Sequence, residues 1–156
     1  MFSRRVVVFL ASGAYLGYAP VASGTFGTLA ALPLLPVFEA ISRISAALYL
    51  LTFAGLVAAA IVIADEAERV FAEEDSGKIV IDEVAGYVAA LLFLPVDLTT
   101  VLGAFFLFRL FDVLKPWPAA WIDRELGGGA GVVLDDVFAG LYANFALRVL
   151  LAVLPL

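Results

Sequence analysis

The sequence contains no cysteine and no histidine. Disulfide bonds, zinc sites with histidine ligands, and cysteine or histidine nucleophiles are therefore all excluded. Any chemistry performed by this chain must use carboxylates, hydroxyl groups, lysine, arginine and the backbone.

Basic residues are also scarce, with 9 Lys and Arg against 15 Asp and Glu and a formal net charge of -6 at pH 7. This balance argues against a nucleic-acid partner, which attracts basic surfaces. It also argues against polybasic attachment to anionic lipid. Attachment to a bilayer would then depend on apolar segments.

Apolar residues are abundant, at 64% of 156 residues, with a mean hydropathy of +1.08. A soluble domain is usually about 45–50% apolar. A domain of this length cannot bury the excess in one core. The composition therefore predicts a membrane protein, and the length predicts a single domain, 1–156.

The first half of the chain contains two long uncharged regions. Val6–Phe38 has no charged residue, but glycine and proline interrupt it, which predicts two helical pieces around a glycine-rich connection at Tyr15–Thr28. Ile44–Ala64 has 21 uncharged residues, or roughly 32 Å as a helix, enough to span the hydrocarbon. We expect this helix to continue into the hydrophilic stretch Asp65–Lys78, which then ends in a turn at Asp75–Gly77.

The second half contains shorter apolar stretches. Val84–Val96 and Leu98–Phe108 predict either a helical hairpin or one long helix kinked near Pro95. Val137–Leu156 is a final apolar segment that includes Arg148. Because strand-like alternation is absent, the expected class is all-α, a multi-helical integral-membrane bundle.

The charge distribution gives a weak indication of orientation. Arg4 and Arg5 favour an N-terminus in the cytosol. Two crossings would then return Asp65–Glu83 to the cytosol, and Arg109–Asp136 lies on the same side only if Val84–Phe108 enters the membrane and comes back. The expected polar site is thus at the membrane–cytosol interface.

The sequence contains four motifs in which polar residues meet apolar sequence, and the first two are Ser23–Thr28 and Asp82–Glu83. In Ser23–Thr28, Ser-Gly-Thr-Phe-Gly-Thr, glycine permits close approach of backbone N–H groups to an anion, although helix packing explains this motif equally well. Asp82 and Glu83 precede an apolar run. The helix dipole accounts for one such acid, whereas paired carboxylates suit Mg²⁺.

The other two motifs follow later in the chain. Arg109, Asp112 and Lys115 are spaced i, i+3, i+6 on one helix face before Pro116, and an internal salt bridge is the alternative explanation. Asp135 and Asp136 follow a glycine run. A helix cap would explain one of these two acids but not both.

Two further groups of charges, Glu73–Asp75 and Asp123–Glu125, are interpreted as solvated surface clusters. The four motifs together supply five carboxylates and two cations, which is the donor set that metal-assisted phosphoryl transfer requires. A cation transporter using buried acids and a phospholipid–alcohol phosphotransferase remain as alternatives.

The four motifs, in this order, resemble the phosphatidylglycerophosphatase A family. The resemblance covers about Ala11–Tyr142 and is most specific in Arg-x-x-Asp-x-x-Lys-Pro-Trp-Pro and Asp-Asp-x-x-Ala-Gly. It implies an all-helical, Mg²⁺-dependent hydrolase of phosphatidylglycerophosphate that acts in glycerophospholipid synthesis at the inner (cytoplasmic) membrane. The uncharged spans predict a multi-pass protein, and the charge distribution predicts an active site facing the cytosol. Ser23 departs from the proline expected before Gly-Thr.

The resemblance also implies residue roles. The expected metal ligands are Asp82, Glu83, Asp112, Asp135 and Asp136, and the expected catalytic residues are Asp82, Arg109, Asp112 and Lys115. Arg109 and Lys115 would bind the substrate phosphate together with Gly24 and Thr25. One carboxylate, which the sequence does not identify, would act as the base on water; a covalent aspartyl-phosphate is less favoured.

Overall fold

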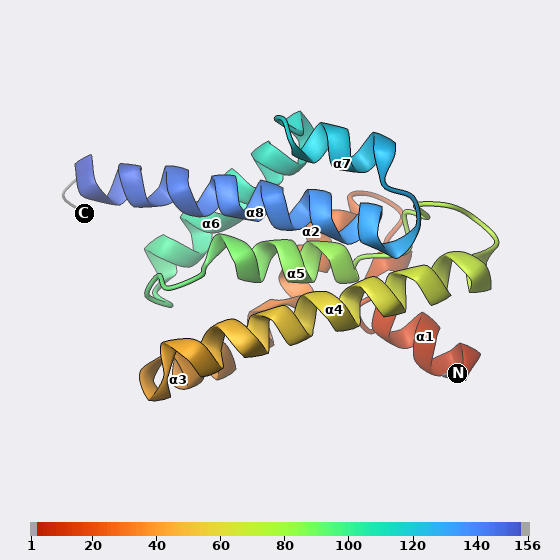
Figure 1. Cartoon of the computed structure of the whole chain (residues 1–156), viewed down its shortest axis with the longest axis horizontal. Coiled ribbons are helices and arrows are strands. Elements are labelled where there is room, and N and C mark those ends of the chain that lie inside the picture. The colour runs from red at the N-terminus through yellow and green to blue at the C-terminus, as the bar shows by residue number, and fades with distance from the viewer. Residues whose placement is uncertain (1–2, 154–156) are drawn as a thin grey trace.

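The computed structural model describes residues 3–153 and contains no strand in that range, which confirms the all-α prediction (Figure 1). The α-helices are α1 (Arg4–Ala11), α2 (Ser23–Ala30), α3 (Leu35–Ile44), α4 (Ala46–Phe71), α5 (Ile81–Ala90), α6 (Leu98–Leu114), α7 (Ala119–Glu125) and α8 (Gly128–Val153). Two short 3-10 turns lie at Leu16–Tyr18 and Leu32–Leu34.

Among the residues that the structure describes, three segments are long and apolar enough to cross a membrane: Ser23–Ile44, Ala46–Phe71 and Gly128–Val153. The second is α4, which contains the predicted span Ile44–Ala64 from Ala46 onward and continues through the first acids of the hydrophilic stretch. Exposed apolar side chains cover much of these helices, for example Leu51, which is 70% exposed. Such surfaces fit a hydrocarbon environment.

The centre of the bundle is α5, which lies between α4 and α8 (Figure 1). Every residue of α5 from Val84 to Ala90 is buried. The close approach depends on glycine: a Cβ at Gly140 would lie 2.0 Å from the Gly86 carbonyl oxygen, and one at Gly86 would lie 2.7 Å from the Asp136 carbonyl oxygen. Small residues at this contact allow the two backbones to meet, as is common between membrane helices.

The C-terminus of α5 ends inside the bundle, where its carbonyl groups need donors. Asn144 on α8 donates to the carbonyls of Ala90 and Leu92 at 3.0 Å each, and the Arg148 guanidinium donates to Leu92 at 2.7 Å. The predicted apolar segment Val137–Leu156 therefore contains two polar side chains with a structural role, although its last three residues lie outside the described range.

The structure decides between the two alternatives for the stretch 84–108 and corrects two other expectations. The stretch 84–108 is a pair of helices, α5 and α6, and not one kinked helix. The expected glycine-rich connection Tyr15–Thr28 is wrong in its second part, because α2 begins at Ser23 and makes the Gly-Thr motif helical. The glycine run Gly127–Gly131 does not precede the final helix but begins it at Gly128.

Candidate active site

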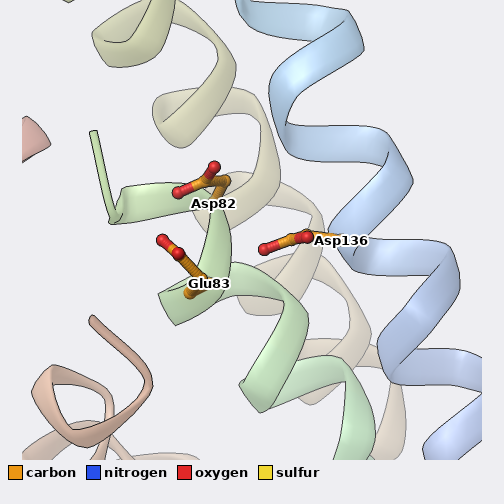
Figure 2. Close-up of side chains that lie close together, drawn as sticks. All are labelled: Asp82, Glu83 and Asp136. Carbon is orange, nitrogen blue, oxygen red and sulfur yellow. The ribbon is translucent and has the colours of Figure 1, made fainter. Parts of the chain in front are cut away.

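Three carboxylates from two helices converge (Figure 2). Asp82 and Glu83 lie in the first turn of α5, and Asp136 lies on α8 at the level where the two backbones approach. One oxygen from each carboxylate lies within 4.8 Å of the others. Since Asp136 is about two turns inside α8, it does not cap this helix.

Asp82 and Asp136 are buried and Glu83 is partly buried, and each has one carboxylate oxygen without a donor in the part of the chain that the structure describes. Asp82 Oδ1, Glu83 Oε2 and Asp136 Oδ2 have no hydrogen-bond partner among residues 3–153. Outside the three candidate spans, burial raises the pKa of Asp82 well above its ordinary value and that of Glu83 to about 7. Buried carboxylates without donors at such short separation fit a divalent cation, which would compensate their charge.

A pocket of about 190 Å³ opens beside this cluster. It is lined by all five acids predicted as metal ligands and by Lys115, together with residues from α2 and the segment before α5. The full lining is Ser23, Asp75, Ser76, Gly77, Ile79, Asp82, Glu83, Asp112, Lys115, Val132, Asp135 and Asp136. The polar motifs, which lie far apart in the sequence, thus meet at one place, although the role of each residue remains a prediction.

Lys115 lies at the end of α6, where its backbone adopts a left-handed conformation with φ 41°. Its ammonium group contacts Asp135 at 2.7 Å and Asp123 at 2.6 Å. Burial lowers the pKa of Lys115, but the two carboxylates outweigh burial and raise this pKa above its usual value. Lys115 therefore stays charged, and Asp123 belongs to the site's surroundings and not only to a surface cluster.

Arg109 does not line the pocket. Its guanidinium forms an ion pair with Asp112 at 2.7 Å and lies 3.9 Å from Glu83. The predicted pairing on one face of α6 is therefore present. Arg109 reaches α5 as well, so this arginine connects two of the expected metal ligands.

Gly24 and Thr25, the predicted phosphate cradle, are also absent from the pocket lining. A Cβ at Gly24 would lie 2.3 Å from Glu83 Oε1 and 2.8 Å from an Arg109 nitrogen. The surroundings of Gly24 thus match the packing alternative, because this glycine allows α2 to lie against Glu83 and Arg109. Its role toward phosphate, like that of Thr25, remains a prediction.

Sequence reasoning overlooked several lining residues. Ser23 was placed in the Gly-Thr motif and noted as a departure from the family pattern, but was given no role in the site. Asp75, Ser76 and Gly77 were interpreted as a turn, with Asp75 also in a surface charge cluster. The seven-residue separation between Asp75 and Asp82 gave no firm signal, because an extended chain of that length can span roughly 25 Å.

Comparison with known proteins gives a consistent result. The family model described as "Phosphatidylglycerophosphatase A" matches residues 9–151. The chain is 34% identical to phosphatidylglycerophosphatase A of Escherichia coli (strain K12) over 133 residues, covering 85% of this chain and 76% of that protein. No solved structure gave a significant match.

Two further relatives were found. A putative phosphatidylinositol-3-phosphatase of Bacteroides thetaiotaomicron is 36% identical over 152 residues, covering 91% of each chain. Phosphatidylglycerophosphatase A of Haemophilus influenzae is 44% identical over 70 residues, covering 44% of this chain and 43% of that protein. With its converging acids, apolar helices and the match over nearly its whole length, this chain belongs to the phosphatidylglycerophosphatase A family.

Proposed function

We propose that this protein hydrolyses phosphatidylglycerophosphate to phosphatidylglycerol and phosphate in a Mg²⁺-dependent reaction of glycerophospholipid synthesis. The observation that carries the proposal is the cluster of Asp82, Glu83 and Asp136, whose buried oxygens lack donors beside a pocket that also contains Lys115. The relatives named phosphatidylglycerophosphatase A support the choice of substrate.

In this proposal Asp82, Glu83 and Asp136 would hold Mg²⁺, which would neutralise phosphate charge and make water a stronger nucleophile. Lys115 offers donors to the phosphate oxygens while its bond to Asp135 holds it in place. Arg109 positions Asp112 and Glu83 through its guanidinium. Asp112, which keeps one oxygen free of the Arg109 contact, can accept a proton from water.

The membrane placement follows the same proposal. The three candidate spans fit a membrane protein, and the pocket is lined by the turn Asp75–Gly77 that follows α4 and by residues in the first turns of α8. We place the protein in the inner membrane with the pocket facing the cytosol, because Arg4 and Arg5 favour that side for the N-terminus.

A second lipid phosphate monoester is also a candidate substrate. The Bacteroides thetaiotaomicron relative is named a putative phosphatidylinositol-3-phosphatase, and its match covers 91% of this chain. The pocket residues would bind a phosphate group in either lipid. The headgroup preference therefore needs a direct comparison of the two substrates.

The test is phosphate release by the purified protein in detergent micelles, with and without Mg²⁺. The substrates are phosphatidylglycerophosphate and phosphatidylinositol 3-phosphate. We expect Mg²⁺-dependent release mainly from the former, and a loss of about a hundredfold or more in Asp82→Asn and Asp112→Asn. Glu74→Gln is the matched control, because Glu74 is exposed and does not line the pocket.

Each variant must elute as a folded protein on size exclusion and keep its helical circular dichroism. Full activity in Asp82→Asn and Asp112→Asn would place the active site elsewhere. Charge movement across proteoliposomes without phosphate release would support the transporter alternative, and release of a nucleotide would support a phosphotransferase.

A further inference from the structure

An apolar groove of about 290 Å³ lies beside the candidate active site, between the start of α7 and the middle of α8. Its lining is Pro118, Phe138, Leu141, Tyr142 and Phe145. The four residues on α8 are spaced i, i+3, i+4, i+7, so they form one continuous stripe along the helix. Phe145, at the far end, is 67% exposed.

The groove offers no polar group that needs a partner. Its polar side-chain atom, the Tyr142 hydroxyl, already donates to the Trp117 carbonyl at 2.7 Å. The Tyr142 ring also packs against Phe111, with centroids 5.6 Å apart. These contacts hold the loop before α7 against α8 and give the groove a defined wall.

The groove and the candidate phosphate site are separate cavities, but each wall of the groove begins three residues after a residue of that site. Lys115 precedes Pro118 by three residues, and Asp135 precedes Phe138 by three residues, while Lys115 and Asp135 are joined at 2.7 Å. At about 1.5 Å per residue, Phe145 lies roughly 15 Å along α8 from Asp135. The same pair of segments thus presents a charged end and an apolar end.

The apolar end leads into the part of α8 suited to the bilayer. Gly128–Val153 is one of the candidate spans, and from Val137 to Val153 its only charged residue is Arg148. A lipid whose phosphate binds near Lys115 would therefore have its diacylglycerol portion directed along this stripe. The alternative occupant of the groove is a second protein chain. Binding of a protein chain would not explain why the apolar stripe begins next to the phosphate site.

The geometry points to this groove as the binding site for one acyl chain of the lipid substrate, which makes it a determinant of chain preference. The inference rests on the proposed function, because it takes the phosphate of that substrate to bind at Lys115. The bilayer is as apolar as the groove, so the chain gains packing contacts and orientation and little transfer free energy.

The test compares two substrates in the same micelles with Mg²⁺: dioleoyl phosphatidylglycerophosphate and its deacylated headgroup, glycerophosphoglycerophosphate. In Phe145→Ala, the ratio of kcat/KM for the acylated to the deacylated substrate should fall about three- to tenfold. Phe106→Ala is the matched control, because Phe106 on α6 is 68% exposed and lies outside the groove. Its ratio should equal that of the wild type.

A second variant tests the groove by filling it. Leu141→Trp should shift the preferred chain length from dioleoyl toward dioctanoyl phosphatidylglycerophosphate, a change that a loss of stability alone would not produce. An unchanged ratio in Phe145→Ala, or an equal loss on both substrates, would overturn the inference. So would an unchanged chain-length profile in Leu141→Trp, or a wild-type protein that self-associates on size exclusion and a Phe145→Ala variant that does not.

The two proposals fail in different ways. If the wild-type protein releases no phosphate from dioleoyl phosphatidylglycerophosphate, the proposed function is wrong. If the wild type is active but its groove variants keep the wild-type substrate ratio and chain-length profile, the function holds and the groove does not bind the chain.

Discussion

Substitution of Gly140 by alanine should separate the two helices that carry the carboxylates. The added Cβ would lie 2.0 Å from the Gly86 carbonyl oxygen and 2.9 Å from the Ala89 Cβ. Ordinary contacts begin at 3.4 Å, so α5 and α8 must move apart by up to 1.4 Å (3.4 − 2.0). Backbone on one side and a methyl group on the other leave no flexible side chain to absorb this shift.

Gly140→Ala should affect both the stability and the activity of the protein, by different amounts. Overpacking a helix contact costs about 1–3 kcal/mol, which would lower the unfolding temperature in detergent by roughly 2–12 °C. Displacement of Asp136 from Asp82 and Glu83 by about 1 Å should lower kcat/KM about a hundredfold. The assays are thermal unfolding followed by circular dichroism and Mg²⁺-dependent phosphate release at a temperature where the variant is folded.

Gly55→Ala is the matched control. A Cβ at Gly55, in the middle of α4, would meet nothing within 4 Å. Because alanine favours a helix over glycine, this variant should be as stable as the wild type or more so, with full activity. If Gly140→Ala keeps both the activity and the unfolding temperature of Gly55→Ala, the helix contact does not determine the geometry of the site.

Two further predictions concern single side chains. Lys115→Met should lower kcat about a hundredfold or more, because it removes a cation from the pocket. Lys115→Arg keeps the positive charge and should retain more of the activity. Equal losses of kcat in the two variants would argue against a role for the charge. Asn144→Leu should lower the unfolding temperature by several degrees, at a cost of about 1–3 kcal/mol, since the Ala90 carbonyl loses its donor. Thr52→Val is its control, because the Thr52 hydroxyl bonds only within α4; an unfolding temperature for Asn144→Leu equal to that of the control would contradict the capping role.

The long helices could be predicted from the sequence because their signal is local. The 21 uncharged residues at Ile44–Ala64 predict a spanning helix, and α4 covers all but the first two of them. The interruptions by glycine and proline near the N-terminus also predict broken helices correctly. The predicted position of the break was wrong, because Ser23–Thr28 is helical and its glycine allows close packing against Glu83 and Arg109.

The membership of the pocket was harder to predict. The five acids and Lys115 were identified from their position next to apolar runs, and all of them line one pocket. Asp75, Ser76 and Gly77 were not identified, because each looks like an ordinary turn or surface residue in the chain, and Ser23 was given no site role although it begins the Gly-Thr motif. Their proximity to Asp82 depends on how α2 and the segment before α5 pack together.

The sequence by itself determined the class of the protein, its apolar spans and the residue types available for chemistry, since these follow from composition and local pattern. Only the tertiary structure decided which carboxylates bring an oxygen within 4.8 Å of one another, and which form ion pairs with Arg109 or Lys115. The physical reason is the contact of α5 and α8 at Gly86 and Gly140, residues distant in the chain whose missing side chains let Asp136 reach Asp82 and Glu83.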